Sequence, residues 1–169
     1  RRPKAGSRQT GSLAMSTRTE TPTARPAVAG VKGARILIVE SRYYADIADA
    51  LIEGAEREIG KSGAVSERIV VPGAFEIPGA IALAADHYDG FVALGCVIRG
   101  ETTHYDTVCD NANHWLMDIA TRHAIPLGNA ILTVENEGQA LERARGGRQG
   151  KGADAVRACL TLIEHARAF

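Results

Sequence analysis

A segment of nine residues, 98–106 (Ile-Arg-Gly-Glu-Thr-Thr-His-Tyr-Asp), carries the residue types best suited to chemistry. Thr102 and Thr103 stand where an apolar strand gives way to a helix, and a helix start offers free N–H groups and partial positive charge to a phosphate or carboxylate. His104 follows in the first turn, and histidine is a residue type well suited to proton transfer. The alternative is that the threonines only cap the helix and His104 is a surface residue. The segment alone leaves both interpretations open.

A second segment, residues 71–78 (Val-Pro-Gly-Ala-Phe-Glu-Ile-Pro), combines a rigid turn with an aromatic ring and a carboxylate. Phe75 and Glu76 fall at the expected end of a strand, where a carboxylate can hold hydroxyl or N–H groups of a polyol or heterocycle. A plain helix-entry turn, with Glu76 favouring the helix dipole, explains the same residues.

Two further side chains are suited to ligands. Tyr43 follows the first predicted strand, and its ring could stack on a flat heterocycle or pack in a core or interface. Arg143 lies on a predicted helix, where it could clamp a phosphate or simply face solvent.

Three other patterns do not support a site. The glycine-rich run 146–152 is one residue short of a nucleotide-triphosphate loop, lacks Ser or Thr after its lysine, and lies between two helices. His104, Cys109 and His114 are five residues apart, so on a helix each is rotated about 140° from the last and they cannot share a metal ion. No cysteine has a base at a recognisable spacing for nucleophilic catalysis. We therefore expect no metal and no catalytic thiol.

Apolar runs alternate with amphipathic helical patterns along the chain. Strands are expected at 36–39, 68–71, 91–98 and 130–134, and helices at 44–59, 77–85, about 104–120, from about 137, and around 156–163. This order predicts an α/β fold: a three-layer αβα sandwich around a flavodoxin-like, four-stranded parallel sheet. Ligands are expected beyond the carboxyl ends of the strands. The segments expected at that edge are Glu40–Tyr44, Pro72–Pro78, Cys96–His104 and Val134–Glu137.

The composition is that of one globular domain with an N-terminal extension. Residues 35–169 are expected to form the domain, and residues 1–34, rich in Arg, Thr, Ser, Gly and Pro, a disordered arm or one that orders partly against a neighbouring subunit. The first methionine is Met15, so residues 1–14 are expected to be upstream or added sequence. The chain has 20 basic and 20 acidic residues, which argues against a general nucleic-acid or membrane surface. Scattered cysteines, no signal peptide and no run of about 20 apolar residues indicate the cytoplasm.

Taken together, these segments resemble the lumazine synthases over about residues 34–169. The motifs that carry the resemblance are 72–78 (Pro-Gly-Ala-Phe-Glu-Ile-Pro), 95–106 (Gly-Cys-Val-Ile-Arg-Gly-Glu-Thr-Thr-His-Tyr-Asp), 133–136 (Thr-Val-Glu-Asn) and 139–144 (Gln-Ala-Leu-Glu-Arg-Ala). The resemblance implies condensation of 5-amino-6-(D-ribitylamino)uracil with 3,4-dihydroxy-2-butanone 4-phosphate. The product would be 6,7-dimethyl-8-ribityllumazine, the penultimate compound of riboflavin biosynthesis.

The resemblance also implies a role for each residue that matches the motifs. His104 would transfer protons. Tyr43 would lie on the pyrimidine ring, and Asn129 of a neighbouring subunit would close over it. Glu101 and Thr102 would meet the phosphate, with Arg143 as its cationic clamp. The residues implied along the ribityl chain and pyrimidine pocket are Ala74, Phe75, Glu76, Cys96, Val97 and Ile98.

Three positions depart from the family pattern. Many relatives have Phe where Asn129 stands, Thr or Ser where Cys96 stands, and Ala where Glu101 stands. The first departure weakens the stacking sandwich, and Glu101 suits a phosphate site only if its side chain faces solvent. None of the three touches His104 or Arg143.

Positioning and proton transfer suffice for this reaction, so no metal or cofactor is expected. The family forms homopentamers, some of which close into sixty-subunit shells, and riboflavin synthase is a further partner that the resemblance suggests. Two alternatives stay open: another flavodoxin-like phosphosugar or nucleotide enzyme, and a riboflavin- or lumazine-binding protein without turnover.

Overall fold

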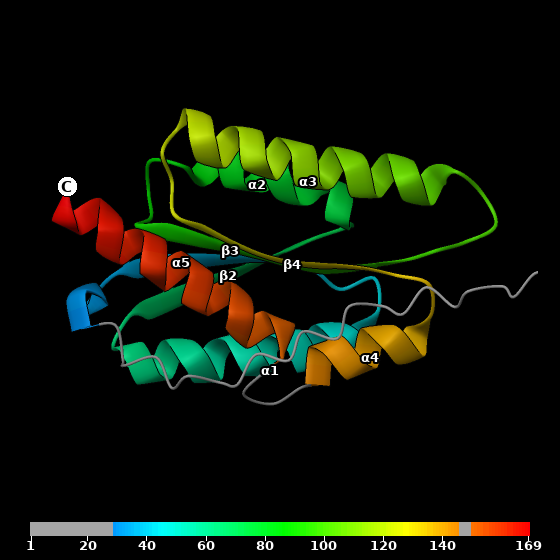
Figure 1. Cartoon of the computed structure of the whole chain (residues 1–169), viewed down its shortest axis with the longest axis horizontal. Coiled ribbons are helices and arrows are strands. Elements are labelled where there is room, and N and C mark those ends of the chain that lie inside the picture. The colour runs from blue at the N-terminus through cyan, green and yellow to red at the C-terminus, as the bar shows by residue number, and fades with distance from the viewer. Residues whose placement is uncertain (1–28, 146–149) are drawn as a thin grey trace, which may run out of the picture.

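The structure, a computed structural model, describes residues 29–145 and 150–169. Strands and helices alternate along the chain (Figure 1). The strands are β1 (Arg35–Ser41), β2 (Val65–Val71), β3 (Gly90–Ile98) and β4 (Leu127–Val134). The α-helices are α1 (Ala45–Ser62), α2 (Ile77–Ala84), α3 (His104–Arg122), α4 (Glu137–Arg145) and α5 (Lys151–Ala168). Two short 3₁₀ helices, η1 (Ala29–Val31) and η2 (Ala74–Glu76), complete the described elements.

The four strands form one parallel sheet in the order β2-β1-β3-β4. Helices α2 and α3 cover one face, and α1, α4 and α5 cover the other (Figure 1). Aliphatic side chains alternate along β1 and β3 and pack in the cores on both faces of the sheet. In β1, Ile36 and Ile38 face the α1 side, and Leu37 and Val39 face the α2 side. The predicted three-layer, flavodoxin-like fold is therefore confirmed.

Several element ends differ from the predicted ones for physical reasons. Strands β2 and β4 each begin three residues earlier than expected, because backbone pairing extends beyond the apolar run. Helix α1 continues through Gly60 and ends at Gly63, whose φ of 74° gives the left-handed C-cap that glycine favours.

The packed part of the chain reaches further towards the N-terminus than residue 35. Val31 and Ala34 are buried in the core on the α1 side, and Arg167 of α5 donates a hydrogen bond to the Gly30 carbonyl oxygen at 2.7 Å. The predicted arm otherwise falls on residues 1–28, which lie outside the described residues, as does most of the glycine-rich run, residues 146–149.

Two glycines allow α5 to approach its neighbours closely. A Cβ atom on Gly128 of β4 would lie 1.8 Å from the Ala155 carbonyl oxygen, and one on Gly152 would lie 2.0 Å from the Leu51 carbonyl oxygen. Backbone atoms cannot give way to this extent without moving the helix. Helix α5 therefore packs on β4 and α1 only because both positions lack a side chain.

We expect Gly128→Ala to lower the free energy of unfolding by at least about 1–3 kcal/mol, the usual cost of overpacking a core. The measurement is the midpoint of urea unfolding at fixed protein concentration. Gly60→Ala is the matched control, because nothing lies within 4 Å of its added Cβ, and alanine in a helix is favoured by roughly 0.5–1 kcal/mol. Equal midpoints for the two variants would contradict the close packing of α5.

Candidate active site

The four strands end together at one edge of the sheet, and the predicted segments follow these ends. Residues 42–44 leave β1, residues 72–76 leave β2, residues 99–103 leave β3, and residues 135–136 leave β4. The register pairs Ser41 with Val71 and Ile98 with Val134, so the ends are level within each pair of strands. The edge predicted for ligands thus gathers most of the candidate residues.

The segment after β3 is braced by Arg99. Its Nη1 donates to Asp106 Oδ1 at 3.2 Å, and its Nε donates to Glu135 Oε1 at 3.2 Å. Its guanidinium also lies 4.1 Å from the centre of the Tyr105 ring, and its backbone N–H bonds the Val134 carbonyl oxygen at 2.9 Å. Arg99 therefore ties the exit of β3 to the end of β4 and to the first turn of α3. Motif spacing alone did not assign it this role.

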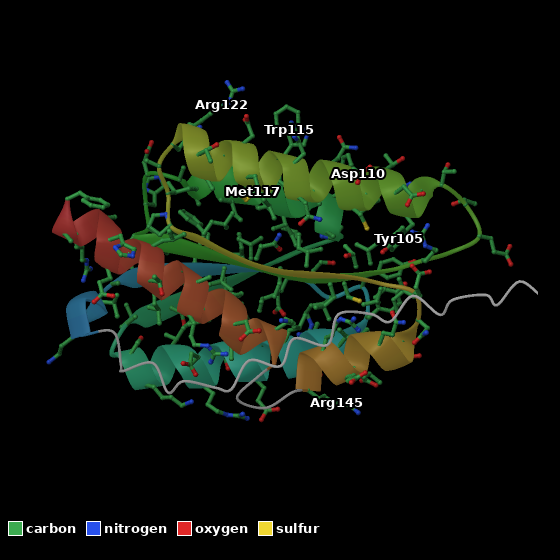
Figure 2. All side chains as sticks on the ribbon, viewed as in Figure 1. Tyr105, Asp110, Trp115, Met117, Arg122 and Arg145 are labelled. Atoms are coloured by element: carbon green, nitrogen blue, oxygen red, sulfur yellow. The ribbon has the colours of Figure 1, made fainter. Side chains whose placement is uncertain are left out.

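His104 is the first residue of α3, and its side chain is exposed. Its backbone N–H is 3.4 Å from Thr102 Oγ1, while the Thr103 hydroxyl at the N-cap makes no cap bond to the helix. Of the two hydroxyls, only that of Thr102 therefore accepts a hydrogen bond from the start of the helix. Tyr105, labelled near the start of α3 in Figure 2, is half-buried, and this burial raises the pKa of its phenol.

The segment after β2 folds back over its own turn. A Cβ on Gly73 would lie 3.1 Å from Glu76 Oε2, which places the Glu76 carboxylate over the glycine. Ala74 is buried beneath the turn, whereas Phe75 and Glu76 are exposed. The chain therefore presents one ring and one carboxylate at the strand-end edge.

The last three residues of β3 divide between the two faces of the sheet. Cys96 and Ile98 join the core on the α1 side, and Val97 joins the core on the α2 side. Tyr43 leaves β1 with 76% of its surface exposed, and its ring lies 5.0 Å from that of Tyr44 at an angle of 70°. An exposed aromatic ring thus stands at the same edge as the β3 exit.

Two predicted residues do not join this group within one chain. Asn129 lies five residues before the end of β4, about 16 Å from the strand-end edge. Its amide donates to Asn113 Oδ1 at 2.7 Å. Arg143 lies on α4 and donates to the Gln139 carbonyl oxygen at 3.3 Å. No hydrogen bond or ion pair within residues 29–145 and 150–169 joins it to Glu101 or Thr102.

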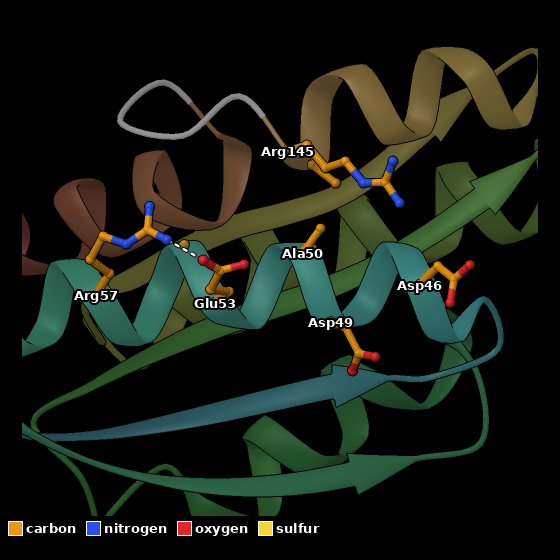
Figure 3. Close-up of a pocket in the computed structure, with 8 residues that line it drawn as sticks. Asp46, Asp49, Ala50, Glu53, Arg57 and Arg145 are labelled. Atoms are coloured by element: carbon orange, nitrogen blue, oxygen red, sulfur yellow. Dashed lines mark hydrogen bonds and ion pairs between the residues drawn. The ribbon is translucent and has the colours of Figure 1, made fainter.

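A hollow of about 460 Å³ lies between α1 and α4, and none of the predicted site residues lines it (Figure 3). Its charged lining consists of Asp46, Asp49, Glu53, Arg57 and Arg145. Arg57 is paired with Glu53, so the excess of carboxylates makes the hollow unsuited to a phosphate. The hollow is therefore not the predicted phosphate site, although Asp49 in its lining binds Arg42 of the connection after β1.

The part of the chain described here contains no group of three His, Cys, Asp or Glu side chains arranged to hold a metal ion. Among its helices, none has the length and hydropathy that crossing a bilayer would need.

Comparison with known proteins identifies the family. The model of the 6,7-dimethyl-8-ribityllumazine synthase family matches residues 33–167. The chain belongs to the 6,7-dimethyl-8-ribityllumazine synthases. A synthase of this name from Agrobacterium fabrum is 53% identical over 136 residues, covering 76% of this chain and 92% of the relative. "6,7-Dimethyl-8-ribityllumazine synthase 1" of Rhizobium meliloti is 51% identical over 144 residues, covering 81% and 94%.

A third synthase, from Azorhizobium caulinodans, is 53% identical over 140 residues, covering 79% of this chain and 86% of the relative. The 6,7-dimethyl-8-ribityllumazine synthase match spans all four strands and the strand-end segments described above. The resemblance inferred from the motifs is confirmed. The chain is accordingly an enzyme of the transferase type, with a place in riboflavin biosynthesis.

The cysteines of this synthase are buried thiols. Burial raises the pKa of Cys96 to about 11 and that of Cys159 to about 12, and it also raises the pKa of Cys109. A thiol with such a pKa is almost wholly neutral at pH 8 and a poor nucleophile. Cys96 therefore meets any ligand at the end of β3 as a neutral group.

We expect iodoacetamide to label the native chain very slowly at pH 8 and to label three thiols after unfolding in urea, as counted by mass spectrometry. Because folding raises these pKa values, the thiols stabilise the folded state fully below pH 9, and this stabilisation is lost between about pH 9 and 12. The urea midpoint should therefore fall across that window, and less so in Cys96→Ser. Rapid labelling of native Cys96 at pH 8 would contradict the burial.

Proposed function

We propose that residues at the strand ends of this synthase carry out the condensation in three chemical stages. The amine of 5-amino-6-(D-ribitylamino)uracil attacks the ketone of 3,4-dihydroxy-2-butanone 4-phosphate, and water leaves to give an imine. The C3 proton and the phosphate group are then eliminated, and the resulting enol tautomerises to a ketone at C3. The ribitylamino nitrogen finally attacks this new carbonyl carbon, and a second water leaves as the lumazine ring closes. The observation that carries this proposal is the convergence of the family motifs at one edge of the sheet.

Proton transfer is assigned to His104. Each stage moves protons between nitrogen, carbon and oxygen, and a positioned acid–base group accelerates such steps by about 10²–10⁴-fold. His104 is exposed in the first turn of α3, and the Arg99 brace fixes where that turn begins. A reactant bound at the end of β3 would therefore lie within reach of its ring.

Phosphate binding is assigned to the start of α3 and to Arg143. Arg99 is the only Lys or Arg within residues 98–106, and two carboxylates already engage it. The phosphate therefore needs a second cation, and Arg143 is the residue that we assign. Thr102 would bind through its hydroxyl or N–H, and Glu101, which is exposed, would use its N–H while its carboxylate faces solvent.

The uracil substrate is assigned to the segments after β1 and β2 and to the last residues of β3. Tyr43 would stack on the pyrimidine ring, a role for which its exposed ring is suited. Phe75 and Glu76 would contact the ribityl chain, with Ala74 beneath them. The walls of this pocket would come from Cys96, Val97 and Ile98.

We also propose that the enzyme works as a homo-oligomer, a pentamer or a shell built of pentamers, in which Asn129 of one subunit completes the site of the next. Asn129 is exposed about 16 Å from its own strand-end edge, so it reaches a substrate only from another subunit. Apolar side chains are exposed on the α2 and α3 side of the sheet: Phe75 of η2, Leu83 of α2, and Trp115 and Met117 of α3. Trp115 and Met117 are labelled in Figure 2.

Native mass spectrometry tests this assembly. Masses at five or sixty times that of the chain are expected, and a monomer at micromolar concentration would contradict a shared site. The three buried free thiols favour a reducing compartment, and we propose the cytoplasm as the place of action, where riboflavin synthase would use the product.

A steady-state assay separates a synthase from a protein that only binds lumazine. Product should form from the two substrates with saturation in each, without added metal or cofactor. Tight lumazine binding without turnover, at an enzyme concentration equal to that of the substrates, would favour the binding protein instead.

A further inference from the structure

The carboxylate of Glu40 is buried at the end of the central strand β1. Its side chain has 0% of its surface exposed, and the residue pairs with Val70 of β2 on one side and with Leu94 of β3 on the other. Along β1 it shares a face with Ile36 and Ile38, which pack under α1. An ionised carboxylate in such a place is costly unless cations meet it.

Two guanidinium groups meet the Glu40 carboxylate. Arg42 Nη1 lies 3.4 Å from Oε2, and Arg68 Nε lies 3.2 Å from Oε1. The Arg68 contact lacks hydrogen-bond alignment, so Oε1 has no aligned donor within the described residues. Arg42 Nη2 also donates to Asp49 Oδ1 of α1 at 2.6 Å. Glu40 is thus the buried centre of an ionic chain from β2, through β1, to α1.

Arg42 belongs to the three-residue connection between β1 and α1, and the next residue is Tyr43. Tyr43 is 76% exposed, and its recorded ring contact is with Tyr44 in the same connection. The Tyr44 hydroxyl and ring supply no cap bond to α1. The Ala48 N–H of α1 donates to the Tyr44 carbonyl oxygen at 2.9 Å, and the bonds from Arg42 to Glu40 and Asp49 are the side-chain polar contacts that hold this connection to the rest of the fold.

We propose that Glu40 is a positioning residue for the uracil substrate: it holds Arg42, and through Arg42 it fixes the place of the Tyr43 ring. This inference rests on the proposed role of Tyr43. The carboxylate does not touch the reactants, but it makes the stacking surface rigid before the substrate arrives, which lowers the entropic cost of binding. Glutamine, which is neutral and has the same shape, would keep the packing but would lose the ionic attraction to Arg42 and Arg68.

The test is Glu40→Gln in two backgrounds, natural and Tyr43→Ala. In the natural background we expect the KM for the uracil amine to rise about tenfold, with kcat and the KM for the butanone phosphate within about twofold of the natural values. In the Tyr43→Ala background the same substitution should change no KM. A double-mutant cycle isolates coupling of this kind. An unchanged KM in the first case, or an equal rise in both backgrounds, would overturn the proposal.

Glu67→Gln is the matched control. Glu67 of β2 also binds an arginine, Arg35 of β1, at 3.1 Å, but it lies near the opposite end of the strands and is largely exposed. Its replacement should leave both KM values unchanged. If Glu40→Gln does not fold, Arg42→Gln removes the same contact between residues 40 and 42. It does so at a half-buried position and should give the same KM pattern. An unchanged uracil KM in Arg42→Gln would equally overturn the proposal.

A readout without turnover keeps this inference separate from the proposed reaction. With 3-fluorotyrosine incorporated, Tyr43 gives a ¹⁹F resonance that Tyr43→Phe identifies. Glu40→Gln should shift or broaden that resonance, and Glu67→Gln should not. A Tyr43 resonance that is the same in Glu40→Gln would refute positioning even if the enzyme is active, whereas absent turnover with a shifted resonance would count against the proposed function alone.

Discussion

Replacement of His104 by alanine is expected to lower kcat by about 10²-fold or more and to leave both KM values within a fewfold of the natural ones. The physical reason is that an acid–base group stabilises the transition state, in which the proton is being transferred, and adds little to the binding of either reactant. The measurement is steady-state kinetics with each substrate varied in turn.

His114→Ala is the matched control for this substitution. His114 lies on the same helix, ten residues or about 15 Å further along, and its ring contacts that of Trp115. Its loss should leave kcat unchanged. A His104→Ala enzyme that loses binding as much as turnover would show that His104 holds a substrate and does not transfer protons.

Replacement of Arg143 by alanine is expected to raise the KM for the butanone phosphate by about ten- to hundredfold, the size of a lost hydrogen bond to a charged group. The KM for the uracil amine should change little, because the clamp meets only the phosphate. The inhibition constant of inorganic phosphate, which competes with the butanone phosphate, should rise by a similar factor.

Arg145→Ala provides the control for the loss of a positive charge on α4. Arg145 lies on the same helix two residues further on and lines the hollow beside α1 (Figure 3). An Arg143→Ala enzyme with the natural KM for the butanone phosphate would remove Arg143 from the phosphate site, and the second cation would then have to be sought elsewhere.

The layers of the fold follow directly from the sequence pattern. Continuous aliphatic runs at 36–39 and 91–98 predict strands buried on both faces, and β1 and β3 are the two central strands. The outer strands are harder to predict: Val65 and Ser66 of β2 are exposed, and in β4 Gly128 and the exposed Asn129 separate the buried Leu127 from the apolar run. Only the backbone pairing shows that both strands begin three residues before their apolar runs.

The sequence predicts which residues lie at the strand ends better than it predicts the contacts that hold them in place. Motif order placed His104, Thr102, Phe75 and Glu76 at one edge, because parallel strands end together. Glu40 is different: a single carboxylate after an apolar run gives no sign of whether arginines meet it. Arg68, its partner from β2, is 28 residues away, and only the register of the sheet brings the two together.

Residues that act between subunits are the least accessible to prediction from one chain. The role expected for Asn129 comes from its place in the order of the family's residues, although many relatives have Phe there. Its position in β4, five residues before the strand ends, keeps it away from its own strand-end edge. The exposed rings of Phe75 and Trp115 give a physical sign of a covered surface, but they do not specify its geometry.

The most direct test of the proposed chemistry is a single-turnover experiment with enzyme in excess over both substrates. Lumazine is followed by its absorbance and inorganic phosphate by a coupled probe. The account predicts that the natural chain forms one lumazine for each phosphate released, without added metal or cofactor, and that His104→Ala slows both together. Phosphate release without lumazine, or no lumazine at any enzyme concentration, would contradict it.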